Sequence, residues 1–175
     1  YRCSKMANNN KIGIEEAGRK ARYDFFDEIL ERTNAQKIAI AHNKNDKVET
    51  VLMHILRGSG INGLKGIEAK RGKYIRPLIE CERNEIEEYC TEKNLQPRID
   101  KTNFENEYTR NKVRNLLIPY IQKEFNPNLI KTIDRLSNLV AEEEKYMDKQ
   151  VEKAYKEMLI SESENEIQLR LKTFN

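Results

Sequence analysis

The sequence predicts an α/β fold, in which part of a parallel-sheet domain is followed by a mainly helical region. Residues 14–56 carry a helical pattern, a short apolar run and a second helical pattern, in that order. Helix–strand–helix order is typical of α/β architecture. After about residue 82, apolar residues recur mainly at helical spacing. We therefore expect residues 1–124 to belong to one domain, and residues 125–175 to form a helical linker and the start of a second domain.

The elements of the first half follow from local patterns. Residues 14–32 predict an amphipathic helix, because apolar side chains recur at every fourth position. The run KIAIA (residues 37–41) suits a strand of a parallel sheet that is covered on both faces. A second helix is expected over about residues 46–56, and it stops at Gly58, where a glycine-rich loop begins.

The second half is dominated by helical patterns. The expected elements are, in order, a short strand over residues 73–79, helices over residues 82–93 and 108–125, a long helix over residues 127–159 and a half-buried strand over residues 166–171. The helix over residues 108–125 should be interrupted near Pro119. The long helix carries an apolar stripe, a pattern compatible with a homodimer.

Composition argues against several classes of protein. No apolar run approaches the length that crosses a bilayer, and the N-terminus lacks the apolar core of a secretory signal. We therefore expect a soluble, cytoplasmic protein with no membrane partner. The three cysteines form no CxxC pair, so zinc ribbons and redox motifs lack their usual signature. A formal net charge of +3 neither demands nor excludes RNA.

The turn after the first strand holds the most informative polar residues. Ligands of open α/β sheets bind beyond the carboxyl ends of the strands, and there His42 is followed by Asp46 and Glu49. Two carboxylates three positions apart share a helical face, where they can hold Mg²⁺, orient an amine or accept its proton. Asp46-x-x-Glu49 is also a capping-box pattern, and the spacing alone favours the cap. His42 alone is more typical of a structural histidine.

The end of the second helix, Arg57-Gly58-Ser59, is a weaker signal. Glycine lets backbone N–H groups approach a phosphate, and arginine adds a charged fork. The same residues also fit a plain turn in which Gly58 caps the helix. The tripeptide by itself leaves both interpretations open.

Two further groups of charged residues lie on predicted helices. Glu15, Arg19 and Arg22 fall within two turns, and Glu15 with Arg19 has the spacing of a surface ion pair. Arg110 and Arg114 lie one turn apart and can face a polyphosphate or an RNA backbone. An exposed basic helix face accounts for the second pair equally well.

Six segments occur in one order along the chain. They are IEEAGRKARY (residues 14–23), AHNKNDKVET (41–50), RGSGINGLKG (57–66), RPL (76–78), DKTN (100–103) and RNKVR (110–114). This order resembles the tRNA(Ile)-lysidine synthetases, whose pattern runs I-E-x-x-A/G-R-x-x-R-Y, A-H-H-x-D-D-Q-x-E-T and R-G-S-G-x-x-G-L-x-G, followed by R-P-L, D-x-S/T-N and R-N-x-x-R. The resemblance spans about residues 14–119, and a chance match of six ordered motifs is implausible.

The resemblance implies an N-type ATP pyrophosphatase, or PP-loop enzyme, with an adenine-nucleotide α-hydrolase-like (Rossmann-like) fold. Residues 1–124 would then be the C-terminal part of its catalytic domain. Such enzymes use ATP and Mg²⁺ and act on a tRNA(Ile) with a CAU anticodon and on free lysine. They adenylylate the C2 oxygen of the wobble cytidine and release pyrophosphate. The amine of lysine then displaces AMP, which forms lysidine.

Carried over by position, the resemblance also implies roles for single residues. The expected reaction-centre residues are His42, Asp46 and Glu49, with Asp46 also a candidate Mg²⁺ ligand. The expected ATP-binding residues are Arg57, Gly58 and Ser59. The expected lysine-binding or tRNA-binding residues are Glu15, Arg19, Arg22, Arg110 and Arg114.

The chain departs from the pattern at several points. Asn43, Asn45 and Lys47 stand where the pattern has histidine, aspartate and glutamine. The charge lost at Asn45 weakens the case for a metal more than the case for lysine. The SGGxDS loop, which cradles the ATP phosphates in this superfamily, does not occur in the sequence, and the first residue is Tyr1. We therefore expect a fragment that does not complete the reaction alone.

Two other functions compete with this hypothesis. Another PP-loop enzyme that modifies tRNA, such as a thiolase, would generally need paired cysteines, and none are present. A non-catalytic helical module that binds RNA or protein comes from a different class. The long predicted helix is compatible with such a module.

Overall fold

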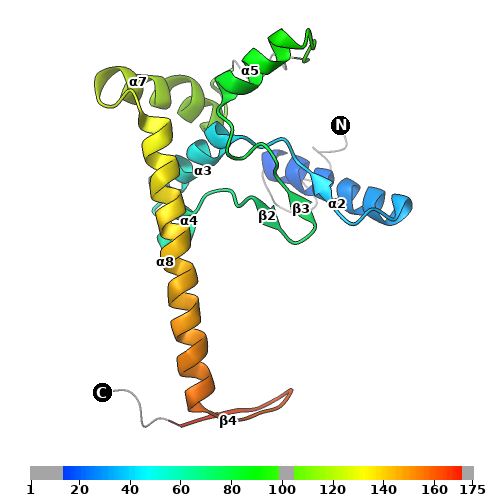
Figure 1. Ribbon diagram of the computed structural model, residues 1–175, viewed down its shortest axis with the longest axis vertical. Coiled ribbons are helices and arrows are strands. Elements are labelled where there is room, and N and C mark those ends of the chain that lie inside the picture. Colours follow the sequence, from blue (N-terminus) through cyan, green and yellow to red (C-terminus); the bar gives the residue numbers. More distant parts are fainter. Residues whose placement is uncertain (1–13, 99–104, 171–175) are drawn as a thin grey trace. The chain divides into compact units, whose positions relative to one another are not determined.

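The computed structural model describes residues 14–98 and 105–170, with side chains described from residue 17 onward (Figure 1). The chain divides into two compact units, and each is described by itself. The first unit comprises Tyr1–Asn43 and Glu68–Cys81, and the second comprises Lys44–Ile67 and Glu82–Asn175. The domain boundary expected near residue 124 stays a prediction.

The first unit contains helix α2 (Ile14–Thr33) and a small sheet. Its strands are β1 (Ile38–Ala39), β2 (Lys70–Arg71) and β3 (Tyr74–Ile75), in the order β1-β3-β2. β1 runs parallel to β3, as the sequence predicts, whereas β2 is antiparallel to β3. The turn between β2 and β3 contains Gly72 with φ +58°, a left-handed conformation that favours a tight hairpin.

The described sheet therefore differs from the expected one in two respects. It is mixed rather than wholly parallel, because the β2–β3 hairpin adds an antiparallel strand. Its strands are only two residues long, and Ala39 of β1 is exposed. The expectation of a strand covered on both faces is thus wrong for the described part of the chain.

The second unit is mainly helical, as predicted. Its elements are α3 (Lys44–Leu56), α4 (Ile61–Leu64), α5 (Arg83–Glu92), α6 (Thr109–Lys112), the π-helical turn η2 (Val113–Leu117), α7 (Ile118–Glu124), α8 (Leu129–Met158), β4 (Leu159–Glu162) and β5 (Ile167–Leu169). In Figure 1, α8 is the long yellow-to-orange helix, and its first half packs against α3, α4 and α7.

One apolar cluster forms the core of this unit. Its buried members come from α3, from the α6–α7 segment and from the first turn of α8, and they are Val48, Leu52, Val113, Ile118, Leu129 and Ile130. Burying such side chains stabilises each by about 1.5–3 kcal/mol relative to exposure. The cluster therefore joins segments that are far apart in the sequence.

The predicted interruption near Pro119 is confirmed and takes the form of a π-helical turn. Pro119 lies at the start of α7 and has no N–H to donate to the preceding turn. The backbone widens just before it, so that the Ile118 N–H reaches the Val113 carbonyl five residues back. Such single π-turns within helices are frequent at functional sites. This turn carries Arg114.

The last described elements are exposed. β4 and β5 form an antiparallel hairpin in which Glu162 pairs with Ile167. All residues of β5 are exposed, so the strand predicted near residues 166–171 is present, but its expected half-burial is wrong. Within the described ranges, no helix has both the length and the apolar character that a membrane span requires.

Candidate functional site

Asp46 and Glu49 of α3 lie at the centre of a cluster of four ionised side chains. The two residues are three positions apart, which places them on one face of the helix. Glu49 is 2% exposed, and both of its oxygens are occupied. One accepts from Arg110 Nε at 2.8 Å, and the other accepts from Arg114 Nε at 2.5 Å. The carboxylate expected at a reaction centre is therefore buried between two guanidinium groups.

The two arginines come from α6 and η2 and lie one turn apart. Each also reaches Asp46, whose Oδ1 accepts from Arg110 at 3.1 Å and from Arg114 at 2.9 Å. Arg114 donates a third bond, from its terminal nitrogen to Glu49 at 2.8 Å. Burial lowers the pKa of Arg114, but the hydrogen bonds and charges of Glu49 and Asp46 outweigh burial, so that its pKa is raised. We call these four residues the carboxylate–arginine tetrad.

The tetrad answers the question of whether Asp46-x-x-Glu49 caps a helix. Helix α3 begins at Lys44, so Asp46 lies inside the first turn instead of preceding it. The Glu49 oxygens accept from arginines and not from the backbone before the helix. Asp46 and Glu49 therefore do not form a capping box with each other. Their carboxylates converge on the same two arginines.

The Arg57-Gly58-Ser59 segment forms a helix cap. The Gly58 N–H donates to Ile55 and the Ser59 N–H donates to His54, which are the two bonds of a Schellman motif. Gly58 has φ +72°, a conformation that glycine adopts without strain. The backbone N–H groups that could have cradled a phosphate are thus occupied by helix carbonyls. The exposed side chains of Arg57 and Ser59 remain available for a ligand.

The glycines that follow this cap keep the loop against α3. The Gly63 carbonyl lies 2.7 Å from His54 Nδ1, and a Cβ at Gly63 would lie 2.6 Å from the Ser59 Cβ. A Cβ at Gly66 would lie 2.8 Å from Val51 Cγ2 and 3.2 Å from Lys47 Cγ. These distances show that the glycine-rich pattern serves close packing of a loop on a helix.

Lys47 shows a contact that the sequence analysis missed. Its side chain is 6% exposed, and its ammonium donates to Asp134 at 2.8 Å and to Asn138 at 2.6 Å. The signal was present, because Asp134 and Asn138 are polar residues four positions apart beside the apolar stripe of the predicted long helix. The partner of the two residues could not be read from the spacing. Lys47 thus ties α3 to α8.

His42 lies in the first unit, whereas the tetrad lies in the second. Its Nδ1 accepts from Arg76 Nε at 3.2 Å, and Arg76 also donates to the Glu68 carbonyl at 2.7 Å. Because arginine can only donate, Nδ1 carries no proton in this arrangement. Arg76 belongs to the RPL segment, so two of the sequence motifs meet here. The proposed reaction-centre role of His42 stays a prediction.

The remaining predicted site residues of the first unit lie on α2. Arg19 and Arg22 of α2 are exposed, and the Arg19 guanidinium lies 5.7 Å from the Tyr23 ring centre. The side chain of Glu15 lies outside the described residues. The expected roles of these three residues stay predictions.

A polar contact of the first unit links α2 to β3. The Tyr74 hydroxyl donates to Asp27, which also pairs with Lys73 at 2.9 Å. The hydrogen bonds from Tyr74 and Lys73 lower the pKa of Asp27. Burial and the Asp27 carboxylate raise the pKa of Tyr74 to about 12.

The described residues do not favour Mg²⁺ at Asp46. No group of three or more side chains that could together hold a metal ion occurs among them. Asp46 Oδ1 already accepts from two arginines, and a cation would face their positive charge at short range. The donor set that Mg²⁺ prefers consists of several oxygens in octahedral arrangement. The tetrad does not fit this requirement.

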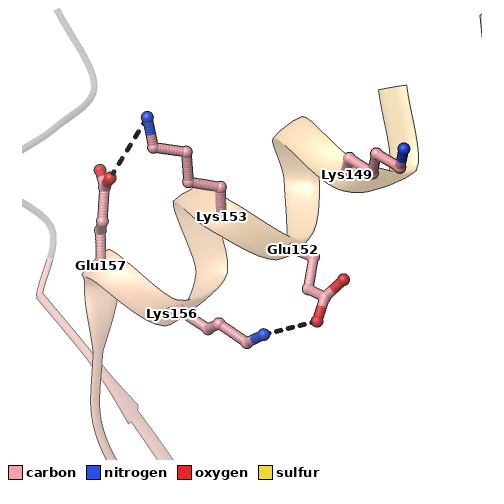
Figure 2. Close-up of a pocket in the computed structure, with 5 residues that line it drawn as sticks. All are labelled: Lys149, Glu152, Lys153, Lys156 and Glu157. Carbon is pink, nitrogen blue, oxygen red and sulfur yellow. Dashed lines mark hydrogen bonds and ion pairs between the residues drawn. The ribbon is translucent and has the colours of Figure 1, made fainter. Parts of the chain in front are cut away.

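A shallow hollow near the C-terminal end of α8 offers no comparable chemistry. Figure 2 shows its lining, which consists of Lys149, Glu152, Lys153, Lys156 and Glu157. Lys156 pairs with Glu152 at 2.6 Å, and Lys153 approaches Glu157 at 4.0 Å. Pairs of this kind on an exposed helix contribute little stability and are open to water. The hollow is a solvated face with three lysines and two glutamates.

Comparison with known proteins identifies the family of the chain. The model of the PP-loop domain family matches residues 1–121, which include all four of its residues. The chain is 47% identical to the tRNA(Ile)-lysidine synthase of Clostridium acetobutylicum over 98% of its length, and 47% identical to that of Clostridioides difficile over 97%. It is 52% identical to the Clostridium tetani protein of this name over 82%. These matches confirm the resemblance that the motifs predicted.

The chain covers only part of these relatives. It spans 37% of the Clostridium acetobutylicum and Clostridioides difficile proteins and 31% of the Clostridium tetani protein. The activity of the full-length relatives is therefore only proposed for this chain.

Proposed function

The chain belongs to the PP-loop domain family, and on that premise we propose that it contributes to the ATP-dependent ligation of lysine to the wobble cytidine of a tRNA(Ile). Its family implies an α/β fold that uses ATP, and the names of its relatives imply tRNA as the substrate. In the proposed reaction, ATP supplies an adenylyl group to the tRNA with release of pyrophosphate, and lysine then displaces AMP. The CAU anticodon and the cytoplasmic location belong to the same proposal.

The observation that carries the proposal is the convergence of Asp46 and Glu49. A free amine attacks only after it loses a proton, and it arrives in water as an ammonium ion. Carboxylates bind ammonium groups by short, charge-assisted hydrogen bonds and can accept a proton from them. Asp46 is more exposed than Glu49 and is the better placed of the two to touch a ligand. We assign it the contact with the lysine ammonium and assign Glu49 the support of this contact.

The other expected site residues complete the proposal. Arg57 and Ser59 would contact ATP through their side chains, because the backbone of their turn is already hydrogen-bonded. The exposed Arg19 and Arg22 would contact tRNA phosphates, since arginine binds phosphate oxygens in a bidentate manner. We assign no described residue to Mg²⁺. A homodimer through the exposed apolar stripe of α8 stays a prediction.

The proposal is tested by separating the two halves of the reaction in the full-length protein. Asp46→Asn and Glu49→Gln preserve shape and remove one negative charge each. Both variants should release pyrophosphate in the presence of ATP and a tRNA(Ile) transcript, yet incorporate less than about 1% of the wild-type radiolabelled lysine, a loss typical of an essential acid–base group. Incorporation near the wild-type level by both variants would contradict the assignment.

A matched control uses a carboxylate of the same unit. Glu144 of α8 pairs with Lys65 and is about one-quarter exposed. Glu144→Gln removes a paired charge from a partly buried position outside the tetrad. Its lysine incorporation should equal that of the wild type, and circular dichroism melting of all variants should show that they remain folded.

A further inference from the structure

The charges of the tetrad balance without any ligand. Asp46 and Glu49 contribute two negative charges, and Arg110 and Arg114 contribute two positive charges. All four side chains are between 2% and 30% exposed, so water screens them only in part. A lysine ammonium that joined this arrangement would bring an uncompensated positive charge into a partly buried site. Such a charge costs several kcal/mol.

The balance is restored if one arginine leaves when lysine arrives. We propose that Arg110 is a positioning residue whose guanidinium closes the carboxylate pair, and that a phosphate group must draw it away before the lysine ammonium can bind at Asp46. This inference rests on the proposed function. It names the order of binding at the same site: phosphate first, lysine second.

Arg110 and Arg114 differ in how firmly they are held. Arg114 contacts Glu49 through two nitrogens, at 2.5 and 2.8 Å, and follows Val113 of the core, which is 2% exposed. Arg110 contacts Glu49 through Nε alone, at 2.8 Å, and its bonds to Asp46 are longer, at 3.1 and 3.4 Å. Arg110 is also the more exposed of the two, at 30% against 24%. Of the two arginines, Arg110 is therefore the one whose departure from the tetrad costs less free energy.

Phosphate is the chemistry that competes best for a guanidinium. It offers several acceptor oxygens and accepts bidentate hydrogen bonds in the same way as a carboxylate. The proposed reaction brings two sources of phosphate to the site, the nucleotide and the tRNA backbone. Once Arg110 pairs with either source, Arg114 and lysine together balance the two carboxylates.

The experiment measures the affinity for lysine in the full-length protein by equilibrium dialysis. The arms contain no further ligand, a non-hydrolysable ATP analogue with Mg²⁺, inorganic pyrophosphate, or a tRNA(Ile) transcript. For the wild type we expect at least tenfold tighter lysine binding in the arm that supplies the phosphate, which corresponds to about 1.4 kcal/mol. If the phosphate comes from the nucleotide, lysine binds more tightly with the ATP analogue or pyrophosphate. If it comes from the tRNA backbone, lysine binds more tightly with the tRNA transcript.

Variants separate the positioning role from a general structural one. Arg110→Gln should bind lysine without any phosphate at least as tightly as the wild type binds it with phosphate, a gain that loss of structure cannot produce. Lys112→Gln is the matched control, because it removes an exposed positive charge from the same short helix. Its affinities should equal those of the wild type. Arg110→Lys keeps the charge without the fork and should retain part of the dependence on phosphate.

Two results would overturn the inference. One is equal lysine affinity of the wild type in all arms. The other is weaker binding of lysine by folded Arg110→Gln in the absence of phosphate. The proposed function is tested apart from this, by lysine incorporation into tRNA(Ile) in the wild type. If incorporation occurs without phosphate-dependent affinity, the inference fails and the proposed function stands.

Discussion

Two charged clusters on the same helix, α3, differ in a way that separates structure from function. On one face, Lys47 is paired with Asp134 and Asn138 of α8, and its side chain is 6% exposed. On another, Asp46 and Glu49 meet two arginines that are 24% and 30% exposed. The first cluster is a single buried pair with its hydrogen bonds satisfied. The second has two groups of each sign and a route to solvent, so that its members can exchange partners.

Burial of one carboxylate does not by itself show that its ion pair serves only stability. Glu49 is 2% exposed and is thus as deeply buried as Val113 of the core, whereas its arginine partners are partly exposed. Under the proposal above, a ligand enters the tetrad by displacing a partly exposed arginine. The ion-pair partner of Lys47 is instead the buried Asp134, although Asn138, which accepts a second hydrogen bond from Lys47, is exposed. The two clusters should therefore respond differently to substitution.

The largest effect is expected from Asp134→Ala. It leaves the Lys47 ammonium buried with only Asn138 as a partner, and breaking a buried pair in this way costs about 3–5 kcal/mol. Urea denaturation followed by circular dichroism measures the loss. The double variant Lys47→Met, Asp134→Leu removes both charges and should recover most of the stability. If the double variant were as unstable as Asp134→Ala, the unpaired Lys47 charge would not be the cause of the lost stability.

Gly66→Ala should have the next largest effect, because Gly66 lies against Lys47 and Val51. Its φ of +64° is unfavourable for alanine, and the new Cβ would lie 2.8 Å from Val51 Cγ2. We expect a loss of about 2 kcal/mol in the free energy of unfolding. Gly60→Ala is the control, because it has an ordinary φ and no atom within 4 Å of an added Cβ. Equal stability of the two variants would contradict the role of close packing.

Glu49→Gln should cost less stability than Asp134→Ala, although it is expected to abolish lysine incorporation. Arg110 and Arg114 are partly exposed and can be hydrated after the charge is lost. We expect a loss of about 1 kcal/mol, in the range of a single hydrogen bond. The same denaturation series measures it. A loss of stability as large as that of Asp134→Ala would show that the tetrad stabilises the fold as much as the Lys47–Asp134 pair does.

The smallest effect is expected at the half-buried Asp27–Tyr74 contact of the first unit. The pKa of Asp27 is lowered by its hydrogen bonds, so its contribution is present above its unfolded pKa of about 3.9 and is lost as the pH falls through the folded value. The pKa of Tyr74 is raised to about 12, so its contribution is lost as the pH rises from about 10 to 12. The melting temperatures of wild type and Asp27→Asn should therefore differ slightly at pH 7 and converge near pH 2.5. A constant difference across this range would argue against the contact.

Much of the local structure could be predicted from the sequence. The helices near residues 14–33, 83–92 and 129–158 follow from apolar spacing, and the break before Pro119 follows from the missing N–H. The family could be predicted as well, because six motifs in one order carry more information than any one of them. The mixed character of the small sheet could not, since it depends on the hairpin at Gly72.

The candidate site could be predicted only in part. The spacing of Asp46 and Glu49 shows that the two carboxylates share a helical face, but it also fits a cap. The arginines were expected to face phosphates, and nothing in their spacing shows that they contact carboxylates 61–68 residues away. Likewise, the sequence of Arg57-Gly58-Ser59 fits a phosphate-binding loop and a helix cap equally well. The hydrogen bonds from its backbone N–H groups to helix carbonyls show that it is a cap.

The helical segments, the family and the carboxylate pair on one face of α3 follow from the amino-acid sequence alone, because these depend on local spacing and on the order of motifs. The groups that neutralise the pair are known only from the folded chain. Contacts between residues far apart in the chain are set by how the apolar cluster packs α3 against the α6–α7 segment and α8. That packing brings two arginines to two carboxylates and one lysine to Asp134.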